Sequence, residues 1–323
     1  MARIDVALGV DIGGTNTVFG YVDRSGRVVR ESSIPTQAHE PSSVFFERLH
    51  AAAEALLLEA GEGCQLAGIG IGAPNANHFK CTIESPPNLS WDFVDVAAEM
   101  KQYYTVPVSL TNDANAAALG EMLFGAAKGM RDFIVITLGT GLGSGLVANG
   151  EMIYGADSFA GEIGHTTVDP NGRACGCGRK GCLETYASAT GICRTMLELM
   201  CDRMDGSRLR SIPPDKITSH LIFDAAQQGD VLAIEAFEMT GRTLGAKLAE
   251  SVVHTSPEAI ILVGGLAAAG DFIFKPTKRS MEEHLLNIFR NKVKILPSGL
   301  KEGNTAVLGA SALIWDILDK TKH

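Results

Sequence analysis

Residues 4–34 read IDVALGVDIGGTNTVFGYVDRSGRVVRESSI, and their pattern is typical of three strands joined by two tight turns. The apolar run at 4–10 predicts a buried strand, and the polar, glycine-containing residues 11–16 predict a turn after it. Residues 17–22 and 28–34 predict two returning strands, with Ser25-Gly26 as the hairpin turn between them.

The same pattern recurs in the middle of the chain. A strand at 133–138 precedes the turn Gly139-Thr140-Gly141, and a strand at 142–148 precedes Asn149-Gly150, a type I′ hairpin signal. A third strand is expected at 152–154. The two copies predict a duplicated β-meander core, one copy in each of two domains; two unrelated hairpins are the alternative.

The remaining segments alternate between helical and extended patterns, which indicates an α/β fold. Helices are expected at 43–60, 115–124, 188–201, 217–228, 231–254, 277–290 and 305–320, and further strands at 66–71, 107–110, 259–263 and 293–296. We expect a small domain of residues 1–118, joined by the C-terminal helix at 305–323. Residues 119–304 then form the larger domain.

Composition excludes several classes of protein. The net charge of -9 leaves no basic excess to attract nucleic-acid phosphates or an anionic membrane surface. No apolar run approaches the roughly 18 residues that a membrane span needs. Arg3 and Asp5 interrupt the position of a signal peptide's apolar region, so no signal peptide is expected. The odd count of 7 cysteines without framework spacing favours a reducing cytoplasm.

A dense set of metal-ligand residues lies at 164–184, in GHTTVDPNGRACGCGRKGCLE. His165, Cys175, Cys177 and Cys182 are spaced H-x9-C-x-C-x4-C, which predicts a tetrahedral zinc knuckle. Four protein ligands leave no open position, so the zinc is structural. The alternative is a set of buried free thiols. Glu162 and Glu184 frame the knuckle, which would fix their positions.

Glycine turns at strand ends predict a phosphate site. Gly13-Gly14-Thr15-Asn16 and Gly139-Thr140-Gly141 can present backbone N–H groups and a Thr hydroxyl to phosphates, and Asp11 is placed to hold a water of a bridging Mg²⁺. Plain hairpin turns are the alternative. Gly264-Gly265 follows another buried strand and offers a flat surface to adenine, or else simply packs a strand against a helix.

These motifs, in this order and along essentially the whole chain, resemble the ROK sugar kinases. The resemblance rests on the Asp11–Asn16 loop, Asn112-Asp113, Gly139-Thr140-Gly141, Gly161–His165 with the cysteine knuckle, and Gly264-Gly265. It implies an actin-like (ribonuclease H-like) ATPase fold, with ATP and a hexose meeting in a cleft between two domains. It also implies a homodimer or homotetramer.

Phosphoryl transfer to a sugar needs a base beside the accepting hydroxyl. Asp113, which follows a strand, is the candidate base, and Asn112 is expected to donate a hydrogen bond to the sugar. Alternatively, Asp113 caps the N-terminus of the following helix; one residue can serve both as base and as cap. The resemblance implies that Glu162, His165 and Glu184 contact sugar hydroxyls. His165 can do so with one ring nitrogen while the other binds zinc.

Two asparagines bear on which sugar is bound. Asn88, in Pro87-Asn88-Leu89-Ser90-Trp91, resembles the sugar-contacting Asn of glucokinase-like members, although Pro-Pro-Asn also suits a rigid surface turn. Asn75 stands where many such members have Gly. It either adds a hydrogen bond or narrows the pocket against bulky substituents.

The sequence therefore predicts a kinase that transfers the γ-phosphoryl group of Mg-ATP to the 6-hydroxyl of a hexose, with D-glucose as the expected substrate. Kinases for N-acetylmannosamine, N-acetylglucosamine, fructose or allose are the alternatives within the family. A sugar-sensing repressor is less expected, because the phosphate loop begins at residue 11 and leaves no room ahead for a DNA-binding domain. A zinc-stabilised binding protein without catalysis is the third alternative.

Overall fold

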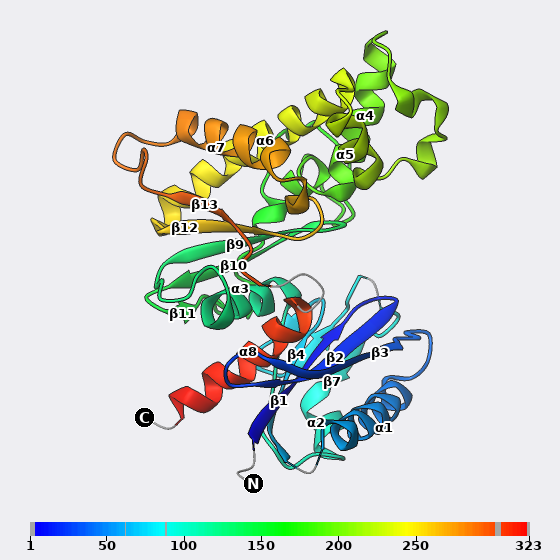
Figure 1. The fold of residues 1–323 in the computed structure, drawn as a ribbon, viewed down its shortest axis with the longest axis vertical. Coiled ribbons are helices and arrows are strands. Elements are labelled where there is room, and N and C mark those ends of the chain that lie inside the picture. Colours follow the sequence, from blue (N-terminus) through cyan, green and yellow to red (C-terminus); the bar gives the residue numbers. More distant parts are fainter. Residues whose placement is uncertain (1–3, 62, 88, 301–304, 322–323) are drawn as a thin grey trace.

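The chain folds into two lobes, each built on its own sheet. The computed structural model describes residues 4–61, 63–87, 89–300 and 305–321. Strands alternate with helices, as predicted, and the strands form two five-stranded sheets and one three-stranded sheet. Figure 1 shows the two large sheets one above the other, with two helices between them. Within these segments, no helix is both long and apolar enough to cross a membrane.

The first sheet has the strand order β3-β2-β1-β4-β8. Its strands are β1 (Ile4–Ile12), β2 (Asn16–Asp23), β3 (Val28–Pro35), β4 (Cys64–Gly72) and β8 (Val108–Thr111). β1, β2 and β3 run antiparallel, whereas β4 and β8 continue the sheet parallel to β1. Helix α1 (Ser42–Ala60) buries Phe45, Phe46 and Leu49 in the core of this lobe.

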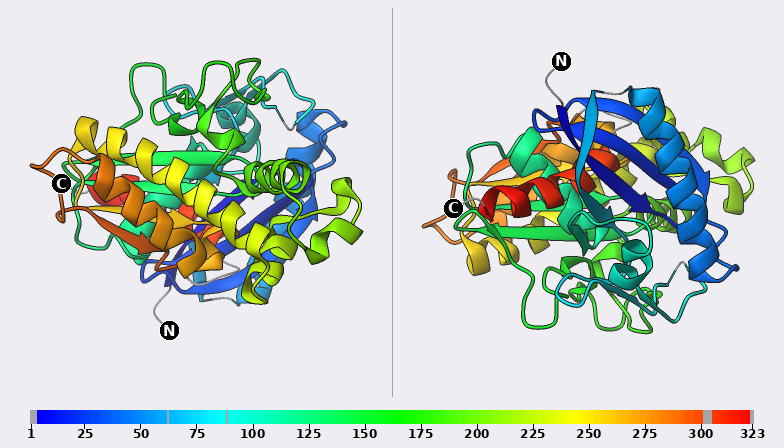
Figure 2. Two further views of the ribbon diagram at one scale, coloured as in Figure 1. Left: turned by 90° about the horizontal axis from the view of Figure 1, so that it is seen from above. Right: turned by 90° about the horizontal axis from the view of Figure 1, so that it is seen from below.

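The second sheet repeats this topology in the order β11-β10-β9-β12-β13. Its strands are β9 (Phe133–Leu138), β10 (Leu142–Ala148), β11 (Glu151–Met152), β12 (Ala259–Val263) and β13 (Lys294–Pro297). The first three are antiparallel and the last two parallel, so the predicted duplication is confirmed. Its helices are α4 (Ala189–Asp202), α5 (Ser219–Gln227), α6 (Val231–Thr255) and α7 (Asp271–His284), of which α6 and α7 lie side by side over the sheet (Figure 2).

Two helices connect the lobes, α3 (Asp113–Phe124) and α8 (Thr305–Lys320). They cross where Gly120 meets Gly309: a Cβ on Gly120 would lie 3.0 Å from the Gly309 Cα, and a Cβ on Gly309 would lie 2.6 Å from the Ala116 carbonyl oxygen. This close crossing needs glycine on both helices. It places the start of α3 beside the first sheet while the rest of the helix packs under β9 and β10.

The predicted position of α7 is wrong. The sequence predicts a helix at 277–290, after Pro276, and a proline inside a helix normally breaks it. The helix instead begins at Asp271 and contains Pro276. The ring of Pro276 fits against α6, where a Cβ on Gly241 would lie 2.5 Å from its Cγ, and this close packing offsets the missing backbone hydrogen bond.

Two further differences involve short elements. β11 ends at Met152 instead of continuing to residue 154, because Tyr154 leaves the sheet and stacks on His78, with 3.9 Å between ring centroids. The sequence also gives no signal for a small sheet and a helix that are too short to show periodicity. These are β5 (Ala76–Asn77), β6 (Thr82–Glu84), β7 (Phe93–Asp95) and α2 (Val96–Lys101).

Candidate active site

The end of β1 and the start of α3 bring two aspartates together. Asp11 pairs in register with Gly72 of β4, and a Cβ on Gly72 would lie 3.4 Å from the Asp11 Oδ1 and 3.9 Å from the Asp113 Cα. Because Gly72 has no side chain, the Asp11 carboxylate extends across β4 toward the first turn of α3. Asp11 and Asp113, which the sequence assigns to the metal and to the base, therefore lie near each other.

The cap of α3 is Asn112 and not Asp113. The Asn112 Oδ1 accepts a hydrogen bond from the Asn115 backbone N–H (2.7 Å), which fulfils the N-cap role that the sequence left open for Asp113. The Asp113 Oδ1 accepts from the adjacent Ala114 N–H (2.8 Å), and Asp113 is exposed. Asp113 therefore retains lone pairs for a ligand, and the Asn112 Nδ2 is left to donate.

The two carboxylates share an electrostatic environment that disfavours charge. Burial, and then repulsion from Asp113, raise the pKa of Asp11 from 3.8 to about 7. Burial also raises the pKa of Asp113. The hydrogen bond from the Ala114 N–H lowers it, but the effect of burial is larger. Asp113 lies deep among protein atoms but is reached by water through an open cleft, so its desolvation is partial. Asp11 is the less accessible of the two, and the repulsion from Asp113 contributes to its raised pKa.

A cleft of about 500 Å³ extends from these aspartates along the edge of the second sheet. Gly264 and Gly265, with Ala267 and Ala268, form its opposite wall. Gly264 has φ of +102°, and a Cβ there would lie 2.7 Å from the Leu138 carbonyl oxygen, so this position needs glycine. A Cβ on Gly265 would meet nothing within 4 Å, which leaves the wall flat.

The two glycine loops lie outside the lining of this cleft. The Gly13 N–H donates to the Asn16 carbonyl (3.1 Å), and the Gly139 N–H donates to the Gly141 carbonyl (3.1 Å). These two amides are therefore used within their own turns. The exposed residues that remain for a ligand are Gly14, Thr15, Asn16 and Thr140.

Glu162, His165 and Glu184 are brought together from two short 3-10 helices, η1 (Ile163–His165) and η2 (Leu183–Thr185). The His165 Nε2 lies 3.9 Å from the Glu162 Oε2. Partial burial raises the pKa of Glu162; His165 opposes this, while the charges of Asp113 and Glu184 add to it. The charge of Asp113 thus acts on Glu162, which indicates that the start of α3 lies near this group of acids.

Glu184 is held by both of its oxygens. Its Oε2 accepts from the Leu142 N–H (3.2 Å), at the end of the Gly139–Gly141 turn, and its Oε1 accepts from the Cys175 thiol (3.3 Å). A Cβ on Gly141 would lie 2.3 Å from the same Oε2, so Gly141 makes room for this acid. Glu184 thus links the knuckle to the second glycine loop.

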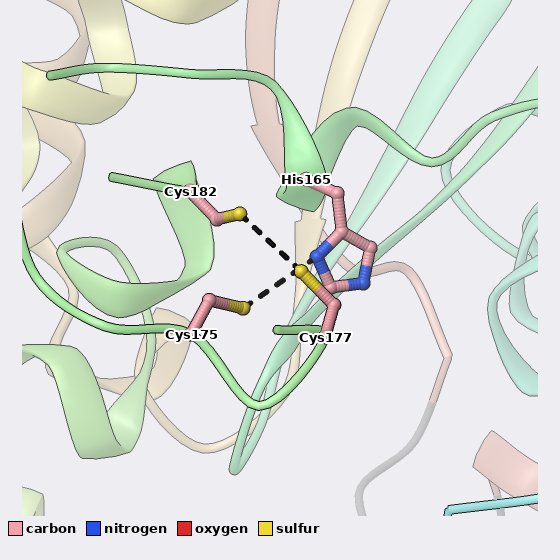
Figure 3. A group of neighbouring side chains, drawn as sticks. All are labelled: His165, Cys175, Cys177 and Cys182. Carbon is pink, nitrogen blue, oxygen red and sulfur yellow. Dashed lines mark hydrogen bonds between the residues drawn. The ribbon is translucent and has the colours of Figure 1, made fainter. Parts of the chain in front are cut away.

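The four predicted zinc ligands converge (Figure 3), with one atom from each lying within 4.8 Å of the others. The Cys177 and Cys182 sulfurs are 3.7 Å apart, and the Cys175 sulfur is 3.8 Å from the His165 Nδ1. Around a tetrahedral zinc, two sulfurs would be separated by about 3.8 Å, and a sulfur and a nitrogen by about 3.6 Å. The donor set therefore fits zinc, with His165 using Nδ1 for the metal and turning Nε2 to Glu162.

Asn75 does not point its amide into the cleft. Its Nδ2 donates to the carbonyls of Glu84 (3.2 Å) and Ser85 (2.9 Å), and its φ of 50° is left-handed. Asn tolerates this conformation better than other side chains, which accounts for its occurrence where Gly is usual. The Nδ2 is thus used by the backbone, and both alternatives for Asn75, an added hydrogen bond to the sugar or a narrower pocket, remain predictions. Asn88 lies outside the described residues.

Sequence reasoning missed two residues that hold this site. The Ser144 hydroxyl of β10 donates to the Gly161 carbonyl and accepts from the Ile163 N–H (3.2 Å), which fixes the backbone on both sides of Glu162. The Arg173 guanidinium donates to the carbonyls of Thr185 (2.7 Å) and Gly191 (3.1 Å), which anchors the knuckle to α4. An arginine within a Gly- and Cys-rich run was the available signal for Arg173; Ser144 had none.

Comparison with known proteins gives consistent matches along the chain. A family model described as ROK family matches residues 7–317. The glucokinase of Halalkalibacterium halodurans is 36% identical over 285 residues, which cover 86% of each protein. A solved ROK family glucokinase from Streptomyces griseus, in complex with glucose and AMPPNP, is 34% identical with a TM-score of 0.78 and covers 95% of this chain and 98% of that one. A ROK family transcriptional regulator is 26% identical with a TM-score of 0.87, over 97% of this chain and 78% of that one.

Proposed function

The chain belongs to the ROK family, and from that premise we propose that it is an ATP-dependent sugar kinase that phosphorylates D-glucose at its 6-hydroxyl. One observation carries the proposal. Asp113, open to a ligand at the head of α3, lines a 500 Å³ cleft, and its charge acts on Glu162. A base, a nucleotide-sized cleft and a set of sugar-binding groups thus meet at one point.

In the proposed reaction, Asp113 accepts the proton of the sugar 6-hydroxyl as that oxygen attacks the γ-phosphorus. The bond from the γ-phosphorus to the β,γ-bridging oxygen breaks, and ADP leaves with the electron pair. The raised pKa of Asp113 makes its carboxylate a better proton acceptor than a free aspartate. Positioning supplies the rest of the acceleration.

The nucleotide is proposed to occupy the cleft with its adenine against Gly264 and Gly265, where a side chain would fill the flat wall. Its phosphates would extend toward Thr15, Asn16 and Thr140 at the cleft mouth. Mg²⁺ held near Asp11 would neutralise phosphate charge. The residues fit a cation, because neither Asp11 nor Asp113 forms an ion pair with Lys or Arg among the residues that the structure describes.

The sugar is proposed to bind Asn112, Glu162, His165 and Glu184. The zinc knuckle supports this site, because His165 belongs to both sets. A thiolate at Cys175 cannot donate to Glu184, so in the protonation state that binds metal the Glu184 Oε1 is available to a sugar hydroxyl. The knuckle would thus set both the position and the hydrogen-bonding capacity of the sugar site.

Glucose is favoured by the segment around Asn88. Leu89 and Trp91 are buried in the core of the first lobe, and the Trp91 Nε1 donates to the Glu40 carbonyl (2.9 Å). Asn88 precedes these anchored residues in the sequence and is proposed to contact the sugar. The relatives named glucokinase add to this choice. N-acetylmannosamine, N-acetylglucosamine, fructose and allose remain the alternative substrates, and a sugar-binding regulator remains the alternative class, since a family regulator shares the fold.

The organisation of the protein is part of the proposal. Residues 1–118 with 305–323 are proposed to form one domain and residues 119–304 the other, which places the boundary within α3. A homodimer or homotetramer is expected from the family resemblance, and light scattering after size exclusion would measure it.

The substitution Asp113→Asn tests the proposal. It should lower kcat by about 10²–10⁴, because an amide keeps the shape but does not accept the proton. The glucose Kd from calorimetry should stay within about twofold. Asp95→Asn is a matched control, since Asp95 also begins a helix of the first lobe but caps α2 away from the cleft. An Asp113→Asn enzyme that retains more than a tenth of the wild-type kcat would rule out Asp113 as the base.

A further inference from the structure

Glu121 is a buried carboxylate that the proposed reaction does not use. It lies on α3, two turns after Asp113, with its side chain fully enclosed. Its oxygens accept hydrogen bonds from the Ala126 N–H (2.7 Å), the Gly299 N–H (3.1 Å) and the Ser298 hydroxyl. Within the described ranges it forms no ion pair with Lys or Arg. Burying a polar side chain of this kind is costly unless its hydrogen bonds are retained.

The segment that Glu121 holds forms part of the nucleotide cleft. Pro297, Ser298 and Leu300 line the cleft at the point where β13 gives way to the approach to α8. The Ser298 hydroxyl also accepts from the Leu300 N–H (3.2 Å). One hydroxyl therefore closes the turn that lines the cleft and ties that turn to Glu121.

The backbones on either side of this contact have little room to rearrange. A Cβ on Gly299 would lie 2.4 Å from the Ala126 backbone nitrogen, and a Cβ on Gly125 would lie 2.1 Å from the Glu121 Oε2. The end of α3 and the turn at 298–300 thus pack backbone against backbone around one carboxylate. A change in this carboxylate must be transmitted to the turn.

We propose that Glu121 is a positioning residue for nucleotide binding. It acts on the nucleotide indirectly, by holding Ser298 in the wall of the cleft. It fixes the cleft wall at 298–300 relative to α3, whose first residue is the proposed base. The inference rests on the proposed function in that the cleft is taken to bind ATP. The proposed sugar-binding groups lie at the other end of α3. Replacing Glu121 should therefore change the affinity for the nucleotide and not the affinity for the sugar.

Calorimetry with AMPPNP and with glucose, on the full chain, tests the inference. Glu121→Ala should raise the AMPPNP Kd by about 10-fold or more, as expected when buried donors lose their acceptor. The glucose Kd should stay within about twofold. Glu121→Gln should recover most of the nucleotide affinity, because its Oε1 can accept from both backbone N–H groups and its Nε2 can donate to Ser298. A residue that only stabilises the fold would lower Tm and leave both Kd values unchanged.

If the Glu121→Ala variant does not fold, the Ser298→Ala variant tests the same inference. It should raise the AMPPNP Kd about fivefold or more, because the turn loses its tie to the carboxylate. Adding Ser298→Ala to a folded Glu121→Ala variant should cause little further loss, since both act through one contact. Ser311→Ala is the control, because this buried hydroxyl of α8 bonds to the Leu308 carbonyl of its own helix (2.9 Å), and its AMPPNP Kd should match the wild type.

Three outcomes separate this inference from the proposed function. An unchanged AMPPNP Kd in Ser298→Ala or in folded Glu121→Ala overturns the role of Glu121 while leaving the kinase proposal intact. A wild-type protein that binds AMPPNP but phosphorylates no sugar overturns the kinase proposal, and the Glu121 effect on nucleotide affinity should still be measured. A wild-type protein that does not bind AMPPNP overturns both.

Discussion

Replacing Asp11 by Asn should stabilise the protein while abolishing its activity. The Asp11 carboxylate is buried beside Asp113, and its pKa is raised from 3.8 to about 7. The unfolded chain ionises Asp11 near 3.8, whereas the folded chain holds the proton until about pH 7. The folded state therefore loses stability relative to the unfolded state as pH rises from about 4 to 7. Above pH 7 the loss is complete and constant.

The size of the effect follows from this difference in pKa. The gap between 3.8 and about 7 corresponds to at most about 4 kcal/mol of unfolding free energy at pH 8. Water in the open cleft screens the charge, and we expect about 1–3 kcal/mol. For a chain of this length, that gain should raise Tm by about 2–6 °C.

Thermal unfolding of wild type and Asp11→Asn, at pH 5, 6, 7 and 8 without Mg²⁺ or nucleotide, measures the effect. The Tm advantage of the variant should be small at pH 5, grow to pH 7 and then level off. Asp5→Asn, an exposed aspartate on the same strand, should show no comparable trend. Mg-AMPPNP should stabilise the wild type more than the variant. A variant that is less stable than wild type, or whose advantage does not change with pH, would refute the reasoning.

Two further predictions concern the knuckle and the base. Protein purified without chelators should contain one zinc per chain by elemental analysis. The Cys182→Ser variant should lose both zinc and affinity for glucose, because His165 belongs to both sites. Loss of zinc with an unchanged glucose Kd would contradict this coupling. The kcat/KM for sugar should fall as pH drops through the raised pKa of Asp113, since the protonated acid does not accept the hydroxyl proton. An acid limb with its midpoint no higher than 3.8 would argue against this assignment.

Much of the fold could be predicted because the signals are local and repeated. The two strand–turn–strand patterns at 4–34 and 133–154 predict the same sheet twice, and the structure has that topology in both lobes. The family matches support the expected actin-like class of fold with two domains. The α7 helix was misplaced because the space that Gly241 leaves for Pro276 is a contact between two helices, which no local pattern reports.

The candidate site likewise contains residues that could be predicted from the sequence and residues that could not. Asp11, Asp113 and the four knuckle residues carry their chemistry in their own side chains and spacing, and the structure brings each set together. Glu121 meets Ser298 across 177 positions of the chain, and Ser144 fixes the loop of Glu162 from a neighbouring strand. Such contacts depend on how segments far apart in the sequence pack against one another in the folded chain. The contacts of the Asn75 amide with the backbone of residues 84 and 85 were likewise not visible in the sequence.

A panel of sugars assayed with Mg-ATP tests the central claim most directly. ADP release would be followed for glucose, N-acetylmannosamine, N-acetylglucosamine, fructose and allose, and the products would be identified by phosphorus NMR. We expect the highest kcat/KM for glucose, a product phosphorylated at the 6-hydroxyl, and weak activity toward the other sugars. A higher kcat/KM for any of the other four would contradict the choice of glucose. The absence of phosphoryl transfer to every sugar, by folded protein that contains its zinc, would contradict the kinase itself.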